Sequence, residues 1–168
     1  MTDRFDFKSY AQGLGFRVAL FAFIGMGWDV LMTLLQQIVA GRVDPNASCP
    51  ASAWMYLAYG GVPLIIYPAA SLFKRLGLFY PARLAGLLVV FYLVELGFGS
   101  TMRTLGITPW DYNWYLQPKW TFHGLITWHP AFIAAWLVFV ALMEWLDAAV
   151  RDSYPAIKEK LLDFWKTV

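Results

Sequence analysis

The chain has 168 residues, of which 60% are hydrophobic, 18% aromatic and 14% charged, and its formal net charge is +2. A soluble domain of this size is roughly half apolar and about a quarter charged, so this composition excludes an ordinary soluble globular protein and indicates a membrane protein. The positive charge is not gathered in a Lys/Arg run and accompanies no nucleic-acid motif, so nucleic acid is not an expected partner.

Four apolar stretches are each long enough to cross a hydrocarbon core of about 30 Å, which takes roughly 20 helical residues. They cover residues 18–40, 51–73, 84–102 and 125–143, and the last helix is expected to continue to residue 147. None of them alternates with the two-residue period of a barrel strand, so all four are predicted to be helices. The predicted fold is all-α, with residues 1–168 forming one transmembrane domain, a bundle of four transmembrane helices.

The distribution of Lys and Arg predicts how the chain lies in the membrane. Ten of these residues precede the first stretch, lie between the second and third, or follow the fourth: Arg4, Lys8, Arg17, Lys74, Arg75, Arg83, Arg151, Lys158, Lys160 and Lys166. The other side has only Arg42, Arg103 and Lys119. The positive-inside rule therefore predicts a multi-pass protein of the cell (inner) membrane with both termini in the cytoplasm and with membrane lipids as partners. The single Cys49 lies in a short outer loop and has no cysteine with which to pair.

Asp29 and Glu95 are the only charged residues inside the four apolar stretches. An ionised carboxylate in the middle of a bilayer costs about 2.5 to 3.5 kcal/mol on insertion scales, so such a residue is expected to have a partner or a function. Both acids lie near the middle of helices that run in the same direction, and their depths differ by only about 3 Å. Because no Lys or Arg lies at that depth and two close carboxylates do not easily both ionise, the pair can hold a shared proton or a cation.

The second helix contributes candidate neighbours for the two acids. Tyr59 and Gly60 lie just outside its midpoint and complete the candidate ligand or ion site. Pro63 and Pro68 leave backbone carbonyl groups that a neighbouring helix or a ligand can use. In the alternative interpretation, the acids are only polar contacts between helices, hydrogen-bonded to Tyr59, Ser100 or the backbone.

The connection over residues 103–127 is unusually aromatic. It contains Pro109, Trp110, Tyr112, Trp114, Tyr115, Pro118, Trp120 and Phe122. It is either a belt of rings in the headgroup layer or a lid over the bundle that carries Asp111, Tyr112 and His123 inward. In the lid interpretation, Asp111 is held by Arg103, by backbone N–H groups after Pro109 or by His123, and Trp110 packs on the helix ends. The sequence is compatible with both interpretations.

After the fourth stretch, Pro155 is predicted to begin a short helix over about residues 155–168. Apolar residues recur there at spacings of three and four, namely Ile157, Leu161, Phe164, Trp165 and Val168, opposite Lys158, Glu159 and Asp163. This pattern is typical of an amphipathic helix on the membrane surface or of a docking site for a partner.

Metal and nucleophile chemistry are poorly supported. His123 and His129, with Asp111, are the only conceivable metal ligands, but no Cys or Glu follows at ligand spacing, so no metal site is predicted. No nucleophile elbow and no phosphate-binding glycine loop is present, so a hydrolase or nucleotidase is not expected. No cofactor is predicted, although a bound lipid is compatible with the sequence.

Several short motifs occur in an order that resembles a known family. They are Gly27-Trp28-Asp29, Ser52-Ala53-Trp54-Met55, Tyr59-Gly60, Glu95 with Gly99, Pro109-Trp110-Asp111-Tyr112 and Gly124-Leu125-Ile126, of which the Pro-Trp-Asp-Tyr block is the most specific. Over about residues 25–145 the chain resembles a family of small bacterial membrane proteins labelled ABC transporter permeases, to which the vertebrate transmembrane protein 229 is similar. It departs from that family in having Asp29 where a glutamate is usual. The resemblance implies the fold and topology, while the chain has no nucleotide-binding module and fewer helices than a usual permease half.

The main functional hypothesis is a small integral membrane protein whose acidic site binds or helps to translocate a cation, a proton or a small amphipathic solute. Because four helices enclose little space, a homo-oligomer or a partner membrane protein is expected. The first alternative is a non-catalytic accessory or assembly subunit of a larger membrane complex. The second is an intramembrane enzyme that acts on a lipid or polyprenoid, with one carboxyl group as general acid and the other as base.

Overall fold

The computed structural model of the chain describes residues 7–43 and 53–167, so Arg4, Cys49 and Ser52 lie outside the described residues. Its helices are α1 (Phe7–Ala11), α2 (Leu14–Val39), α3 (Trp54–Gly60), α4 (Val62–Arg75), α5 (Tyr80–Thr104) and α6 (Pro130–Thr167). Between α5 and α6 lie two short 3-10 helices, η1 (Tyr112–Trp114) and η2 (Pro118–Trp120), and two strands, β1 (Thr121–Phe122) and β2 (Ile126–Thr127). The fold is thus all-α except for one two-residue antiparallel ladder.

Four helical segments are long and apolar enough to cross a membrane, as predicted. They are Leu14–Val39, Trp54–Arg75, Tyr80–Thr104 and Pro130–Lys166, with mean hydropathies between 1.3 and 2.0 over their most apolar windows. Many of their large apolar side chains point outward, among them Phe23, Leu93 and Val138, which are 68%, 63% and 61% exposed. An apolar surface of this kind on several helices fits a lipid environment or a protein partner better than water.

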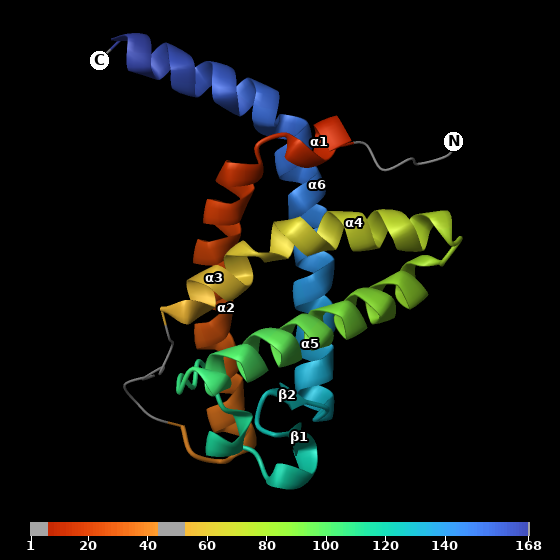
Figure 1. Cartoon of the computed structure of the whole chain (residues 1–168), viewed down its shortest axis with the longest axis vertical. Helices are drawn as coiled ribbons and strands as arrows, with labels where there is room; N and C mark the ends of the chain where they lie inside the picture. Colours follow the sequence, from red (N-terminus) through yellow and green to blue (C-terminus); the bar gives the residue numbers. More distant parts are fainter. Residues whose placement is uncertain (1–6, 44–52, 168) are drawn as a thin grey trace.

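Helices α2 and α6 run along the long axis of the molecule, and the hairpin of α4 and α5 crosses them obliquely (Figure 1). Helix α1 and the C-terminal part of α6 lie at one end, here called the terminal end, whereas the strands lie at the opposite, loop end (Figure 1). Helix α6 contributes much of the core, including Phe132, Trp136 and Phe139, whose side chains are at most 1% exposed. Ring contacts between Phe91, Trp136 and Phe139, with centroids 4.8 to 5.7 Å apart, join α5 to α6.

The second predicted helix is interrupted at Gly61, between α3 and α4. Pro63, which has no N–H group, lies in the first turn of α4, where no such donor is needed. Pro68 lies inside α4 and cannot donate to the carbonyl of Leu64, four residues earlier. The hydroxyl of Tyr10, from α1, donates to that carbonyl instead at 3.3 Å. A proline within the helix therefore leaves an acceptor that attaches the N-terminal segment to α4.

The fourth predicted helix and the observed helix α6 begin and end at different residues. It was expected to begin at Leu125, but α6 begins at Pro130, because Phe122 pairs with Ile126 and Thr121 with Thr127 in the ladder. Pro155 was expected to begin a separate helix, but it lies inside the continuous helix α6. Since a proline removes one backbone hydrogen bond and its ring crowds the carbonyl four residues earlier, it bends a helix. The C-terminal part of α6 accordingly turns away from the other helices (Figure 1).

Candidate functional site

Asp29 and Glu95 line the same small cavity, one from α2 and the other from α5. Its volume is about 20 Å³, and the other lining residues are Met32, Gln36, Met55, Tyr59, Trp110 and Tyr112. A cavity of this size has room for about one water molecule. Glu95 is 8% exposed, and the described residues that line the cavity include no Lys, Arg or His. The structure therefore brings the two predicted acids together in one enclosed site.

Tyr59 is positioned beside Asp29 by close packing of α3 on α2. A Cβ atom at Gly25 would lie only 2.0 Å from Cγ of Tyr59, so only glycine leaves room for this ring. The hydroxyl of Tyr59 donates to Oδ1 of Asp29 at 3.5 Å. Gly60, also predicted at the site, does not line the cavity and instead faces Val18 of α2.

Tyr112 reaches Glu95 from the loop after α5. Its hydroxyl donates to Oε1 of Glu95 at 3.4 Å, whereas Oε2 of Glu95 has no hydrogen-bond partner among the described residues. Burial raises the pKa of Tyr112 well above its ordinary value, and the nearby Glu95 carboxyl raises it further, so the phenol stays a neutral donor. Both tyrosine–carboxyl distances exceed the usual range of about 2.5 to 3.0 Å for O–H···O hydrogen bonds. Glu95 thus has acceptor capacity that Tyr112 uses only weakly.

Asp111 organises the loop that carries Tyr112. Its Oδ2 lies 3.2 Å from a terminal nitrogen of Arg103, and its Oδ1 accepts from the backbone N–H of Asn113 at 2.8 Å. Arg103 also donates to the backbone carbonyl of His123, so this carbonyl, and not the imidazole, links His123 to the cluster. Gly124 has φ of +70°, and a Cβ atom there would lie 2.0 Å from Oδ1 of Asp111. This turn therefore needs glycine for both its conformation and its space.

The loop over residues 105–129, here called the cap loop, has two different faces. Trp110, Tyr112 and Leu116 point inward and are 9%, 4% and 5% exposed, and the indole N–H of Trp110 donates to the carbonyl of Leu125 at 2.9 Å. Its outward face presents Trp114, Phe122 and Trp128, which are 43 to 49% exposed. The inward positions of Trp110 and Tyr112 agree with the lid interpretation, but His123, which that interpretation also turned inward, is exposed at the tip of the ladder.

Asp111, His123 and His129 are the residues that were considered as metal ligands. Among the described residues, no three His, Cys, Asp or Glu side chains come together in a group that could hold a metal ion. The ring of His129 packs edge-on against Trp120, with centroids 5.0 Å apart, and His123 packs against Phe122.

An apolar groove adjoins the acidic cavity and has a volume of about 50 Å³. It shares Glu95, Tyr59, Met55 and Trp110 with that cavity and then continues between α4 and α5. Its remaining lining is entirely apolar: Ala58, Val62, Ile65, Ile66, Leu87, Val90, Phe91, Val94, Phe98 and Val140. Among the described residues that line it, Glu95 therefore places a single carboxyl group in a groove that is otherwise suited to hydrocarbon.

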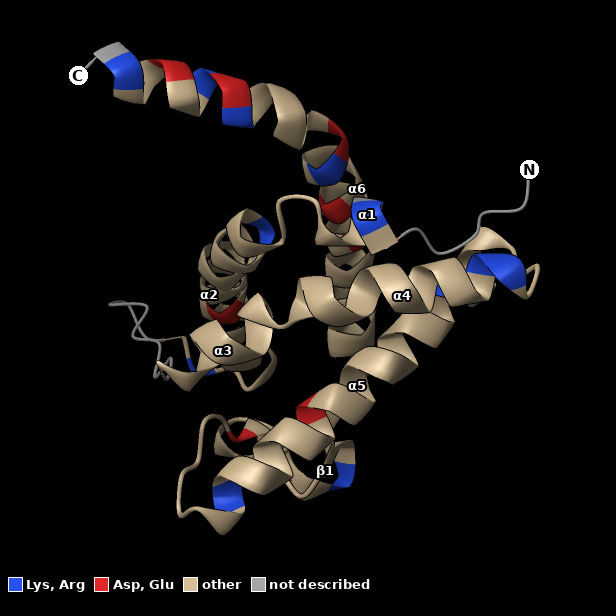
Figure 2. Cartoon of the chain, turned by 45° about the horizontal axis from the view of Figure 1, so that its top comes forward, with Lys and Arg blue, Asp and Glu red and all other residues tan. Residues whose placement is uncertain are grey.

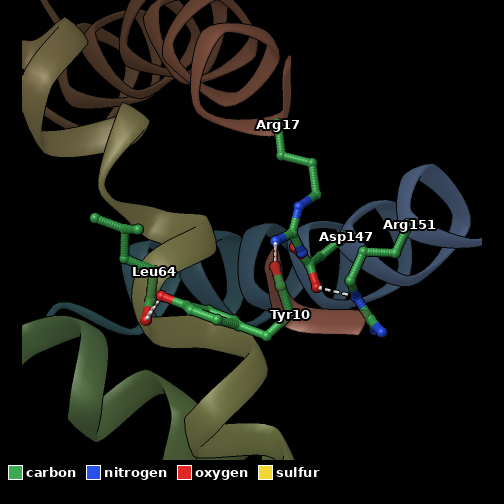
Figure 3. A network of polar contacts seen from close by, with 5 residues as sticks. All are labelled: Tyr10, Arg17, Leu64, Asp147 and Arg151. Atoms are coloured by element: carbon green, nitrogen blue, oxygen red, sulfur yellow. Dashed lines mark hydrogen bonds and ion pairs between the residues drawn. The ribbon is translucent and has the colours of Figure 1, made fainter. Parts of the chain in front are cut away.

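A buried charged cluster at the terminal end was missed by the sequence analysis, which treated Arg17 and Arg151 as flanking charges. A terminal nitrogen of Arg17 lies 2.7 Å from Oδ1 of Asp147, and the two side chains are 0% and 2% exposed. Nε of Arg151 lies 3.0 Å from Oδ2 of Asp147, and Arg17 also donates to the backbone carbonyl of Tyr10 (Figure 3). The four-residue spacing of Asp147 and Arg151 was the available signal, because such pairs meet on one helix face.

Fold and site together define an all-α protein with four helices of membrane-spanning length and an enclosed pair of acids between two of them. Comparisons with protein-family models, curated proteins and solved structures found no match to this chain. The resemblance to the permease-labelled family therefore rests on the sequence motifs alone.

Proposed function

We propose that this chain is a multi-pass membrane protein that binds a small amphipathic solute with a cationic, hydrogen-donating head group. The head would be held by Glu95 and Asp29, and the apolar tail would lie in the groove between α4 and α5. The observation that carries the proposal is the position of Glu95, which is shared by the acidic cavity and the apolar groove and has one carboxyl oxygen that no described residue hydrogen-bonds.

The chemistry of the site favours an ammonium-like head over a bare metal ion. Ca²⁺ takes about six to eight oxygen ligands, which is more than two carboxyl groups and two phenols supply in so small a cavity. An ammonium group instead needs a few acceptors and offers N–H donors that match the free Oε2 atom of Glu95. A proton is the smallest occupant compatible with the same pair, and it would leave the apolar groove without a role.

The arrangement in the membrane is part of the same proposal. The termini would lie in the cytoplasm of a cell membrane, as the ten-to-three distribution of Lys and Arg predicts. The placement of α1 and the C-terminal part of α6 at one end supports a common side of the membrane for these two segments (Figure 1). Translocation of the solute would then require displacement of the Trp110–Tyr112 segment, which closes the site toward the loop end of the molecule.

Binding of n-hexylamine to the purified protein in detergent micelles tests the proposal, with intrinsic tryptophan fluorescence as the readout because Trp110 borders the site. We expect saturable binding of n-hexylamine and much weaker binding of n-hexanol, which lacks the charge, and of methylammonium, which lacks the tail. Glu95→Gln should weaken n-hexylamine binding by on the order of tenfold or more, since a hydrogen bond to a charged group contributes about 1.5 to 3 kcal/mol. Glu159→Gln, on the exposed C-terminal part of α6, is the matched control. Equal binding of the amine and the alcohol would refute the proposal.

A second candidate function, an accessory subunit, is favoured by the C-terminal part of α6. Leu161, Leu162, Phe164 and Trp165 are 47 to 70% exposed there, and this segment extends away from the other helices (Figure 1). An exposed apolar stretch with alternating charges fits a membrane surface or a partner helix. Co-purification of a specific membrane protein with the whole chain, lost when residues 156–168 are removed, would favour this function.

A further inference from the structure

A second, polar pocket lies at the terminal end between α4, α5 and α6, separate from the acidic cavity. Its volume is about 230 Å³. Helix α4 contributes Ser71 and Lys74, α5 contributes Tyr80 and Arg83, and α6 contributes Glu144 and Arg151, among other residues. Hydroxyl groups and cations from three helices therefore converge on one opening.

The charges around this pocket do not balance. Arg17 and Arg151 both contact one carboxylate, that of Asp147, at 2.7 and 3.0 Å. Glu144 lies 3.0 Å from Nε of Arg83. With Lys74 added, four cationic side chains meet two carboxylates among the described residues, an excess of two positive charges over that part of the chain. An excess of this kind, in part buried, is stabilised by an anion.

Two of these cations have N–H groups that make no hydrogen bond with the described residues. The terminal nitrogens of Arg83 and Nζ of Lys74 make no hydrogen bond with any described residue. The Arg83 side chain is only 15% exposed, and its guanidinium group lies over the ring of Tyr80 at 4.8 Å, which holds it in place. A guanidinium group presents parallel N–H donors that match two phosphate oxygens, and a nearby ammonium group adds a third contact.

The surroundings of the pocket favour a lipid as the source of the phosphate. Trp145 lines the pocket and is 65% exposed, and Tyr80 is 49% exposed. Leu76 and Phe79, in the turn between α4 and α5, are 64% and 72% exposed. Amphipathic rings of this kind lie at the headgroup layer, and apolar side chains next to them can contact acyl chains. Figure 2 shows Lys and Arg residues at the α4–α5 turn and on the C-terminal half of α6.

We propose that this pocket binds the phosphate group of an anionic membrane glycerophospholipid, with Arg83 and Lys74 as the principal donors. The inference does not depend on the acidic site, because the two pockets share only Ile66, an apolar lining residue of the groove. Anionic lipids would be preferred over zwitterionic ones because the excess positive charge repels a choline group.

Lipid binding to the purified chain in detergent tests this proposal by native mass spectrometry, with phosphatidylglycerol, phosphatidylcholine and inorganic phosphate as separate probes. We expect phosphatidylglycerol to bind more tightly than phosphatidylcholine, and Lys74→Gln to weaken it on the order of fivefold, the usual contribution of one basic residue near a membrane surface. Lys74 is exposed, so this variant should keep the fold. The double variant Arg83→Gln with Glu144→Gln removes the second donor while leaving the net charge of the pocket unchanged, and it should weaken binding at least as much.

The double variant Lys158→Gln with Lys160→Gln, on the exposed C-terminal part of α6, is the control and should leave the affinity unchanged. If this control weakens binding as much as Lys74→Gln does, the lipid is held by diffuse charge and the pocket assignment is wrong. If millimolar inorganic phosphate displaces phosphatidylglycerol, the pocket recognises a free phosphate and the assignment to a lipid is overturned.

Discussion

Arg17 of α2 and Asp147 of α6 are 130 residues apart in the chain, yet their side chains form a 2.7 Å ion pair that is almost completely buried. Two charges removed from water are expensive unless each keeps its partner. The pair therefore couples the register of α2 to that of α6 at the terminal end of the molecule.

The first prediction concerns this ion pair. Asp147→Asn should lower the free energy of unfolding by about 3 kcal/mol or more, because it leaves the buried Arg17 and the neighbouring Arg151 without their shared carboxylate. Arg151→Gln should cost less, since Asp147 keeps Arg17. Thermal unfolding in detergent, followed by circular dichroism, measures both. Asp152→Asn, an exposed acid on the same helix, is the control, and equal stability of Asp147→Asn and this control would contradict the prediction.

The second prediction separates backbone strain from crowding in the cap loop. Gly124 and Gly106 have φ of +70° and +75°, but only a Cβ atom at Gly124 would meet other atoms within 4 Å. Each change to alanine should cost about 1 to 2 kcal/mol for the left-handed conformation. Gly124→Ala should in addition displace Asp111 and expose the cap loop to proteases. Equal rates of proteolysis in the two variants would show that the contact with Asp111 is unimportant.

The third prediction addresses Asp111 directly. Asp111→Ala removes the acceptor of the Asn113 N–H group and the partner of Arg103, so the cap loop should become more mobile and more sensitive to proteases. The loss of such a capping side chain typically costs about 1 kcal/mol. Limited proteolysis with mass mapping of the cleavage sites is the measurement. Asp163→Ala, in an exposed pair with Lys166, should leave the cap loop unchanged.

The fourth prediction concerns the two enclosed acids. Asp29→Asn and Glu95→Gln should leave the protein folded, because the amides keep the shape of the acids and one acceptor for the tyrosine hydroxyls, while binding of n-hexylamine is impaired. The reason is that an amide keeps one acceptor oxygen but has no negative charge to attract an ammonium group. Normal binding by both variants would leave the acids with a purely structural role as polar contacts between helices.

The fifth prediction is a dependence of stability on alkaline pH. An ordinary tyrosine titrates near pH 10, whereas burial raises the pKa of Tyr112 in the folded state. Tyr112 then contributes stability in full below pH 10, and this contribution is lost as the pH rises above 10, because the unfolded state releases the proton first. Tyr112→Phe should therefore make the loss of stability above pH 10 less steep. Unfolding followed at several pH values between 8 and 11 would detect this change, and parallel curves for both proteins would exclude it.

Much of the fold could be predicted from local features of the chain. Four helical segments of membrane-spanning length appear where the apolar stretches predicted them, the second divided at Gly61, because length and apolarity suffice to identify a segment that can span a membrane. Their ends were less predictable. An apolar run that begins at Leu125 predicts a helix there, but Ile126 and Thr127 pair with β1, and such a ladder depends on a turn between two segments. Pro155 was read as a helix start, although a bent helix tolerates an internal proline.

The sequence by itself determined which residues carry charge within the apolar stretches, since Asp29 and Glu95 can be read directly from the chain. Only the tertiary structure decided what surrounds them: Tyr112 from the cap loop beside Glu95, and an apolar groove that reaches the same carboxyl group. The tertiary structure also determined that Arg17 forms an ion pair with Asp147. The physical reason is that apolarity and helical period are local properties of a chain, whereas the partner of a side chain depends on the rotation and tilt of whole helices, which are set by packing between segments far apart in sequence.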